Sequence, residues 1–309
     1  PRRPLSSAGK PIRKEKRQTR SSDTKHPKSD PMKTSHRPAS GICPSRRGTL
    51  QKLSAVILTI SLVSSISSGL STATADEPPQ NLQIYVLMGQ SNMAGRGELQ
   101  KTREPLHPRI QMLTKEERWV PASEPLHFDK SIAAAGLGAS FAVRMAESDP
   151  QAVIGLIPCA VGGTPLSRWQ KGEDLYEQAL KRIRTAQKSG TVRGILWHQG
   201  ENDSLDLQKA ESYARRLAKM VDDLRTDLND ADVPFVAGTL GDFLSNDAGG
   251  KPYHWKTVNA QLQLLPGLSA RTAIVDAGGL KAKSDGVHFD TPSLRTLGER
   301  YADAIQQLQ

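Results

Sequence analysis

The sequence predicts an α/β fold: a three-layer α/β/α sandwich with a central, mostly parallel, five-stranded sheet. Two observations support this prediction. Short apolar segments alternate with longer segments of helical periodicity after residue 76. The short segments are apolar throughout rather than alternating with polar residues, which is typical of parallel strands buried on both faces.

Each element follows from its local pattern. Residues 207–228 show the clearest helical periodicity, with apolar residues at spacings of three and four. Residues 95–130 are rich in proline and charge and lack a clear period, so we expect an irregular segment that shapes a substrate site. Strands are expected at residues 83–88, 153–157, 192–197, 234–238 and 272–275, and helices at 138–147, 175–187, 207–228, 253–264 and 292–307.

The charge is distributed unevenly along the chain. The net charge of +10 would by itself suggest a nucleic-acid partner. All of the basic excess lies before residue 76, and residues 76–309 are slightly acidic. We therefore expect no nucleic-acid partner.

The basic N-terminal part resembles an export signal. Residues 53–70 are uncharged and apolar or small; basic residues precede them, and Ala73-Thr74-Ala75 follows. This pattern is typical of a secretory signal peptide cleaved after Ala75, with a retained membrane anchor as the alternative. We expect a secreted or periplasmic protein with no stable membrane insertion after cleavage.

The predicted organisation therefore has three parts. Residues 1–52 form a basic segment that is disordered or an overextended start, since Met32 would begin a more ordinary signal peptide. Residues 53–75 form the rest of the signal peptide, and residues 76–309 form one domain. Cys159 is the only cysteine after the leader, so this domain has no internal disulfide. We expect Cys159 to be a small buried residue rather than a nucleophile.

The first expected strand ends in Gly89-Gln90-Ser91-Asn92-Met93. A strand-to-helix turn at this place presents the Ser91 hydroxyl at the edge of the sheet. The serine could be only a helix N-cap, but it could also be a nucleophile if a histidine reaches it. Asp285 and His288 are three residues apart, so a tight turn can point both side chains the same way.

Two further segments follow expected strands. Gly162-Gly163 lies in a loop after residues 153–157, and His198-Gln199-Gly200-Glu201-Asn202-Asp203 follows residues 192–197. Glycine N–H groups and side-chain amides are common donors to an oxyanion. Because the carboxyl ends of parallel strands share one edge, we expect these groups to lie near Ser91.

Together, the three blocks resemble those of the SGNH hydrolases. The Gly-Gln-Ser-Asn-Met and Trp-x-Gln-Gly-Glu-x-Asp forms resemble the sialate O-acetylesterase-like and carbohydrate esterase family six (acetylxylan esterase) branch, over residues 82–308. The resemblance implies a flavodoxin-like fold, no cofactor and no metal. It implies Ser91 as nucleophile, His288 as base and Asp285 as its orienting group. It also implies an oxyanion hole from the N–H groups of Ser91 and of Gly162 or Gly163, with Gln199 and Asn202 as alternative amide donors.

Other polar residues near these blocks are candidate substrate contacts: Gln90, Asn92, Arg168, Trp169 and Glu201. Trp169 could stack on a sugar or only pack on the next helix. Glu201 and Asp203 could form a glycosidase-like carboxylate pair, but we favour a role in fixing the loop. His198 has no accompanying metal-binding motif, so we interpret it as structural.

The sequence thus predicts a secreted serine carbohydrate esterase that removes O-acetyl groups from an acetylated carbohydrate through an acyl-enzyme. We expect acetylated xylan to be preferred. The alternatives are a sialate O-acetylesterase, another SGNH lipase or thioesterase, and a catalytically inactive carbohydrate-binding protein. Oligomeric state stays open.

Overall fold

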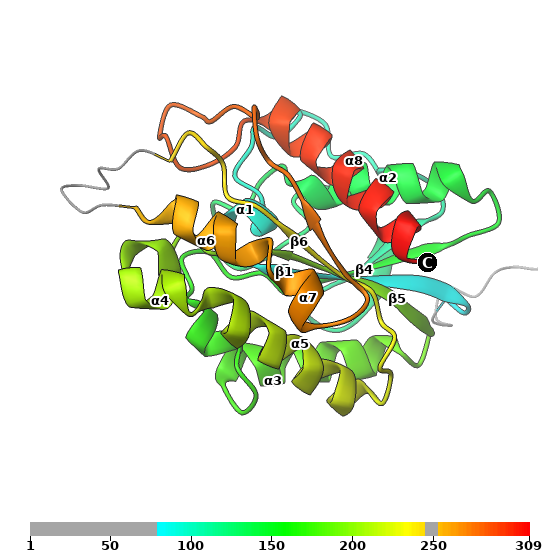
Figure 1. Cartoon of the computed structure of the whole chain (residues 1–309). Coiled ribbons are helices and arrows are strands. Elements are labelled where there is room, and N and C mark those ends of the chain that lie inside the picture. The colour runs from blue at the N-terminus through cyan, green and yellow to red at the C-terminus, as the bar shows by residue number, and fades with distance from the viewer. Residues whose placement is uncertain (1–78, 245–252) are drawn as a thin grey trace, which may run out of the picture. The chain divides into compact units, whose positions relative to one another are not determined.

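The computed structural model describes residues 79–244 and 253–309, and the predicted signal peptide and N-terminal segment lie outside these ranges. The described residues form an α/β body around one seven-stranded sheet, of order β3-β2-β4-β1-β5-β6-β7 (Figure 1). The predicted fold class is confirmed. The strands are β1 (Leu82–Gly89), β2 (Ile110–Leu113), β3 (Trp119–Pro121), β4 (Ile154–Pro158), β5 (Gly190–His198), β6 (Phe235–Gly238) and β7 (Thr272–Val275).

The sheet has seven strands rather than the expected five. The additional strands, β2 and β3, pair antiparallel with each other inside the segment that we expected to be irregular, and β2 continues the parallel sheet on β4. Both are four residues or shorter. Strands of this length give too few positions for a period to be recognised, and β3 is only partly buried because it forms the sheet edge.

Helices cover both faces of the sheet. Successive side chains of β1 point to opposite faces: Ile84, Val86 and Met88 pack in one core and Tyr85 and Leu87 in the other. The first core is shared with α3, α5, α6 and α7, and the second with α2 and α8 (Figure 1). The helices are α1 (Ser91–Ala94), α2 (Leu137–Ser148), α3 (Asp174–Ala186), α4 (Leu207–Glu211), α5 (Tyr213–Leu228), α6 (Trp255–Leu262), α7 (Leu265–Leu268) and α8 (Thr291–Leu308), with 3-10 turns η1 (Leu166–Trp169) and η2 (Asp203–Leu205).

One expected helix is divided. Residues 207–228 form α4 and α5, which meet at Ser212. The Ser212 hydroxyl donates to the carbonyl oxygen of Gln208 at 2.8 Å, and such a bond competes with the helical backbone ladder. The apolar period continues across the break, so the pattern alone does not reveal it.

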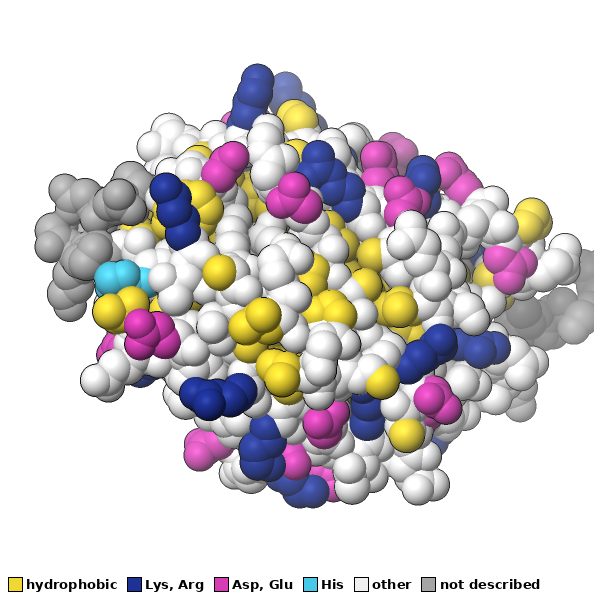
Figure 2. All heavy atoms as spheres, in the orientation of Figure 1, with side chains coloured by type: hydrophobic (Ala, Val, Ile, Leu, Met, Phe, Trp, Pro, Cys, Tyr) yellow, Lys and Arg dark blue, Asp and Glu magenta, His cyan; other side chains and the backbone are white. Residues whose placement is uncertain are grey.

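The surface of this body carries both signs of charge. On the face shown in Figure 2, Lys and Arg side chains are interspersed with Asp and Glu side chains. This agrees with the nearly balanced composition of residues 76–309. Within the ranges that the structure describes, no helix is both long enough and apolar enough to cross a membrane.

The central strands β1 and β5 approach each other closely at their carboxyl ends. Gly89 pairs with His198, and its φ is +134°, which L side chains rarely adopt. A Cβ at this position would lie 2.1 Å from the carbonyl oxygen of His198. Gly89 therefore lets the two strand ends meet directly before Ser91.

We predict that Gly89→Ala lowers the free energy of unfolding by about 3 kcal/mol or more, because the new methyl group meets backbone and the φ is strained. Equilibrium urea unfolding measures this change. Gly267→Ala is the matched control: nothing lies within 4 Å of its added Cβ, so a change within about 1 kcal/mol is expected. Equal effects of the two substitutions would contradict the importance of this approach.

Candidate active site

Ser91 lies at the start of α1, directly after the end of β1. The N–H of Gln90 donates to the carbonyl oxygen of His198 at 2.9 Å, so the turn before Ser91 is fastened to β5. The Ser91 side chain reaches the Nε2 of His288, with 3.0 Å between Oγ and Nε2. Residues 197 positions apart in the sequence thus meet at the carboxyl edge of the sheet.

His288 is oriented by Asp285. Its Nδ1 lies 2.9 Å from Asp285 Oδ2, and Asp285 Oδ1 accepts the N–H groups of Val287 and His288, both at 2.9 Å. Partial burial raises the pKa of Asp285, but these hydrogen bonds outweigh it and lower the pKa to about 2. An ionised Asp285 places the imidazole proton on Nδ1 and leaves Nε2 to accept the Ser91 proton. The arrangement can activate a hydroxyl for attack.

Asn92 fastens the segment that carries His288. Its Oδ1 accepts the N–H of Phe289 at 3.1 Å, and its Nδ2 donates to the carbonyl oxygen of Val287 at 3.2 Å. The same Nδ2 donates to Glu201 Oε1 at 2.5 Å. Asn92 is only 2% exposed and does not line the cavity beside Ser91, so this position does not agree with the expected substrate contact.

Glu201 is a buried carboxyl group in the wall of that cavity. Burial raises its pKa to about 7, although the hydrogen bond from Asn92 opposes this shift. Its Oε2 has no hydrogen-bond partner among the described residues. Glu201 thus titrates near neutral pH inside the site. It contacts Asn92 rather than His288, whose partner is Asp285.

Gln199 is enclosed in a network of other side chains. Its Nε2 lies within 3.2 Å of three acceptors, which are Gln90 Oε1, the Thr164 carbonyl oxygen and Asp203 Oδ2. Its Oε1 accepts the hydroxyl of Tyr213, and the residue is 0% exposed. Its amide hydrogens are therefore already used, which does not agree with the expected role of oxyanion donor. Gln90, by contrast, lines the cavity as expected of a substrate contact.

Asn202 is better placed than Gln199 to donate to a substrate oxygen. It is partly exposed, it lines the cavity, and its Nδ2 donates to the carbonyl oxygen of Gly163 at 3.0 Å. The second Nδ2 hydrogen stays free for a ligand. Asp203 is fully buried and pairs with Arg216, so it cannot form a carboxylate pair facing a substrate with Glu201.

The two glycines of the 158–164 loop differ in their hydrogen bonding. The N–H of Gly162 donates to Asp129 Oδ2 at 2.9 Å, so it is not free to bind an oxyanion. The N–H of Gly163 has no hydrogen-bond partner among the described residues, and its φ is +80°. Of the two expected glycine donors, the structure leaves Gly163 available.

Trp169 and Arg168 do not take part in the cavity beside Ser91. Trp169 is 0% exposed, packs edge to face on Trp197, and donates its Nε1–H to Thr164 Oγ1 at 3.2 Å. Arg168 is partly exposed and forms an ion pair with Asp174. The prediction that a sugar stacks on Trp169 is therefore wrong. The structure agrees with the alternative, in which Trp169 packs against neighbouring elements of the protein. The sequence does not show which side of the η1 turn faces inward.

The cavity beside Ser91 measures about 300 Å³. The irregular segment 95–130, which we expected to shape a substrate site, contributes Arg96 and Lys130 to its walls, and Val287 lies between Asp285 and His288. The sequence did not point to three further residues of the wall, because no motif marks them: Ile132, Leu205 and Tyr253.

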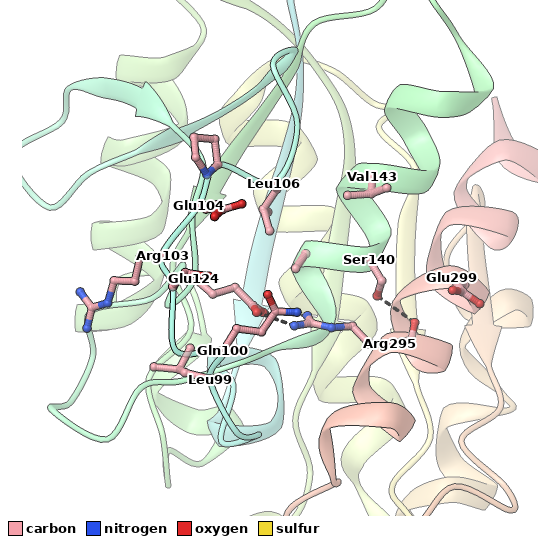
Figure 3. Close-up of a pocket in the computed structure, with 13 residues that line it drawn as sticks. Leu99, Gln100, Arg103, Glu104, Leu106, Glu124, Ser140, Val143, Arg295 and Glu299 are labelled. Atoms are coloured by element: carbon pink, nitrogen blue, oxygen red, sulfur yellow. Dashed lines mark hydrogen bonds and ion pairs between the residues drawn. The ribbon is translucent and has the colours of Figure 1, made fainter.

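A larger cavity, of about 400 Å³, lies between α2, α8 and residues 99–106 (Figure 3). Its charged residues at the base neutralise each other: Arg295 forms an ion pair with Glu124, and Gly136 donates to the same carboxylate. Figure 3 also shows Ser140 bonded to the backbone of Arg295 rather than pointing freely into the space. Ser91, His288 and Asp285 do not line this cavity. The volume of a cavity therefore does not identify the active site.

The remaining titratable groups near the strand ends are held in structural contacts. His198 is fully buried, its Nδ1 lies 3.1 Å from the Tyr301 hydroxyl, and burial lowers its pKa to about 4. Burial raises the pKa of the Cys159 thiol to about 11, which keeps it protonated. Across residues 79–244 and 253–309, no three His, Cys, Asp or Glu side chains are grouped so as to hold a metal ion.

The chain is similar to known carbohydrate esterases. Residues 81–307 match the family model described as carbohydrate esterase, sialic acid-specific acetylesterase. A probable carbohydrate esterase of Arabidopsis thaliana is 36% identical over 260 residues, which are 78% of this chain and 96% of the relative.

The solved structures agree with this family match. The X-ray structure of the Arabidopsis protein superposes with a TM-score of 0.66 and 35% identity, over 74% of this chain and 99% of that one. NanS (TM-score 0.58, 19% identity, 75% and 98% covered) and a carbohydrate acetylesterase from Xanthomonas citri (0.56, 20%, 73% and 56%) share the fold.

The buried Glu201 gives a prediction for stability against pH. A carboxyl group whose pKa is higher in the folded state stabilises the fold below its unfolded value, near 4.5, and this contribution is lost as pH rises through about 7. We predict that Glu201→Gln, which cannot ionise, gains stability relative to the wild type as the pH rises. Between pH 4 and a pH above 7, the difference in free energy of unfolding between the two proteins should shift by on the order of 3 kcal/mol in favour of the variant.

Urea unfolding of both proteins from pH 4 to pH 8 measures this difference. The depressed pKa values of His198 and His127 act in the opposite direction in both proteins, so only the difference between the two curves reports on Glu201. Parallel curves over the whole range would show that the pKa of Glu201 is not raised.

Proposed function

Because the chain belongs to the carbohydrate esterase family described as sialic acid-specific acetylesterase, we propose that it is a secreted serine esterase that removes O-acetyl groups from a glycan through an acyl-enzyme. One observation carries this proposal. Ser91 Oγ lies 3.0 Å from His288 Nε2, and His288 Nδ1 lies 2.9 Å from Asp285 Oδ2. This is the order of contacts that a hydroxyl nucleophile needs.

The reaction follows from these contacts. Ser91 Oγ attacks the ester carbonyl carbon while its proton passes to His288 Nε2. Asp285 stabilises the imidazolium that forms and keeps its ring in place. As the tetrahedral intermediate collapses, the sugar alcohol leaves with the proton from His288, and the acetyl group stays on Ser91. Water then attacks this ester with the same assistance and releases acetate.

The oxyanion needs donors that are in place before the reaction. We assign these to the N–H groups of Ser91 and Gly163 and to the free hydrogen of Asn202 Nδ2. All three residues line the cavity beside Ser91, and Asn202 is held there by its hydrogen bond to the carbonyl oxygen of Gly163. Each such donor typically lowers the barrier by about 3 kcal/mol.

Two acetylated glycans are the main candidates for the substrate. From the sequence we expected acetylated xylan, whereas the description of the matched family names sialic acid. The cavity wall carries two cations: Arg96 is paired with Asp129, but Lys130 forms no ion pair with another described residue. Lys130 could bind the carboxylate of a sialic acid, whereas xylan itself offers no such group. On this basis we propose acetylated sialic acid as the substrate.

Secretion is supported by the sequence alone, through the uncharged segment 53–70 and the Ala73-Thr74-Ala75 that follows it. A glycan substrate outside the cytoplasm agrees with such a leader. An N-terminal residue of Asp76 in the exported protein would support this part of the proposal.

We predict that the protein hydrolyses aryl acetates and that turnover falls by at least about tenfold from acetyl to octanoyl esters, because the cavity of about 300 Å³ must also hold the alcohol. Acetate release from acetylated sialic acid and from acetylated xylo-oligosaccharides identifies the glycan. The control, Ser91→Ala, should keep its fold and lose roughly 10⁴-fold or more of the turnover.

The alternatives have different signatures in the same experiment. A profile that peaks at octanoyl esters would indicate a lipase or thioesterase. Absence of hydrolysis of every ester by a folded wild type would indicate a carbohydrate-binding protein without activity. Near-wild-type turnover in Ser91→Ala would remove Ser91 from the mechanism.

A further inference from the structure

The loop that offers Gly163 to the substrate is held from outside by a buried carboxylate. We propose that Asp129 is a positioning residue for this reaction: together with Arg96, it fixes the Gly162 peptide so that the next amide, Gly163 N–H, is kept free and aimed at the oxyanion. The inference rests on the proposed esterase function and assigns a residue that touches neither substrate nor Ser91.

The geometry around Gly162 carries the first step. Asp129 Oδ2 accepts two hydrogen bonds, from Gly162 N–H at 2.9 Å and from Arg96 Nη2 at 2.8 Å. An added Cβ on Gly162 would lie 2.5 Å from Arg96 Nη2 and 3.4 Å from Ser91 Cβ. Gly162 is therefore enclosed between the Asp129–Arg96 pair on one side and the candidate nucleophile on the other.

The loop has one internal bond, from the Thr164 hydroxyl to the carbonyl oxygen of Val161 at 2.8 Å, and the two glycines between these residues need further anchors. Two consecutive glycines have no side chains to restrict their backbone, so they populate many conformations unless outside groups hold them. Asp129 holds the N–H of Gly162, and Asn202 holds the carbonyl oxygen of Gly163. The peptide between these two anchors carries the Gly163 N–H, which has no hydrogen-bond partner among the described residues. An amide that is fixed on both sides and left unpaired is what a preorganised oxyanion site requires.

The charge on Asp129 is suited to this role. The side chain is 0% exposed and Arg96 is 5% exposed, so the two residues form a buried ion pair. An ionised acceptor binds an N–H more strongly than a neutral one.

Arg96 also connects this anchor to the catalytic histidine. Its carbonyl oxygen accepts the Nζ of Lys283 at 2.5 Å, and the N–H of Lys283 donates to the carbonyl oxygen of His288 at 2.7 Å. The oxyanion loop and the His288 loop are thus fastened to the same residue. This arrangement sets the donors and the base relative to Ser91.

Two double variants test the role of Asp129 without leaving a buried charge unpaired. Asp129→Asn with Arg96→Met keeps a side-chain oxygen that can accept the Gly162 N–H, whereas Asp129→Leu with Arg96→Met removes this acceptor at similar volume. For aryl acetate hydrolysis, we expect the Leu pair to have about 100-fold lower kcat than the Asn pair, with KM unchanged within about threefold. Thermal unfolding verifies that both are folded.

Equal kcat in the two folded variants, or a loss confined to KM, would overturn the inference. If the Leu pair does not fold, Asp129→Ala with Arg96→Met takes its place. Added formate should then restore part of the lost kcat, because it supplies an acceptor for the Gly162 N–H. A kcat of the Ala pair equal to that of the Asn pair, with no effect of formate, would also overturn the inference. The wild type and Ser91→Ala, measured in parallel, separate the two proposals: an inactive wild type removes the esterase function, whereas an active wild type with equal variants removes only the role of Asp129.

Discussion

The direct approach of β1 and β5 at their carboxyl ends is the constraint on which the site depends. Only a glycine at position 89 lets the backbone of one strand contact the carbonyl oxygen of His198 on the other. This contact places Ser91 beside the loop that follows β5, which supplies Glu201 and Asn202. The sheet is thus the rigid part, and the reacting groups lie on short loops directly after its strands, where their positions are well defined.

Around this edge, buried polar groups hold one another rather than facing the substrate. Asn92 ties the His288 segment to Glu201, and Gln199 ties Gln90 to the loop after β4. Buried polar groups are costly unless they are bonded, so such a network has one favoured arrangement and specifies the loop conformations. Because these bonds occupy most of the polar groups, few are left free for the reaction, and Gly163 N–H is one of them.

Much of this could be predicted from the sequence, because parallel strands bring their carboxyl ends to one edge. That rule placed Ser91 and the blocks after the later strands together, and the apolar segments identified the central strands. It did not reveal β2 and β3, which are too short to show a period. The rule also could not tell which groups of each block face inward. Trp169 is buried, and the Gly162 N–H donates to Asp129, a residue of another segment of the chain.

The proposed esterase reaction requires that Ser91 is a nucleophile activated by His288. Reaction with an aryl phosphonate ester, followed by peptide mass spectrometry, tests it most directly, because such reagents bond covalently to an activated serine hydroxyl and do not depend on the glycan. We expect a single adduct on Ser91 in the wild type and a rate of labelling lower by roughly 100-fold or more in His288→Ala. An adduct on another residue, or equally fast labelling of Ser91 without His288, would contradict the claim.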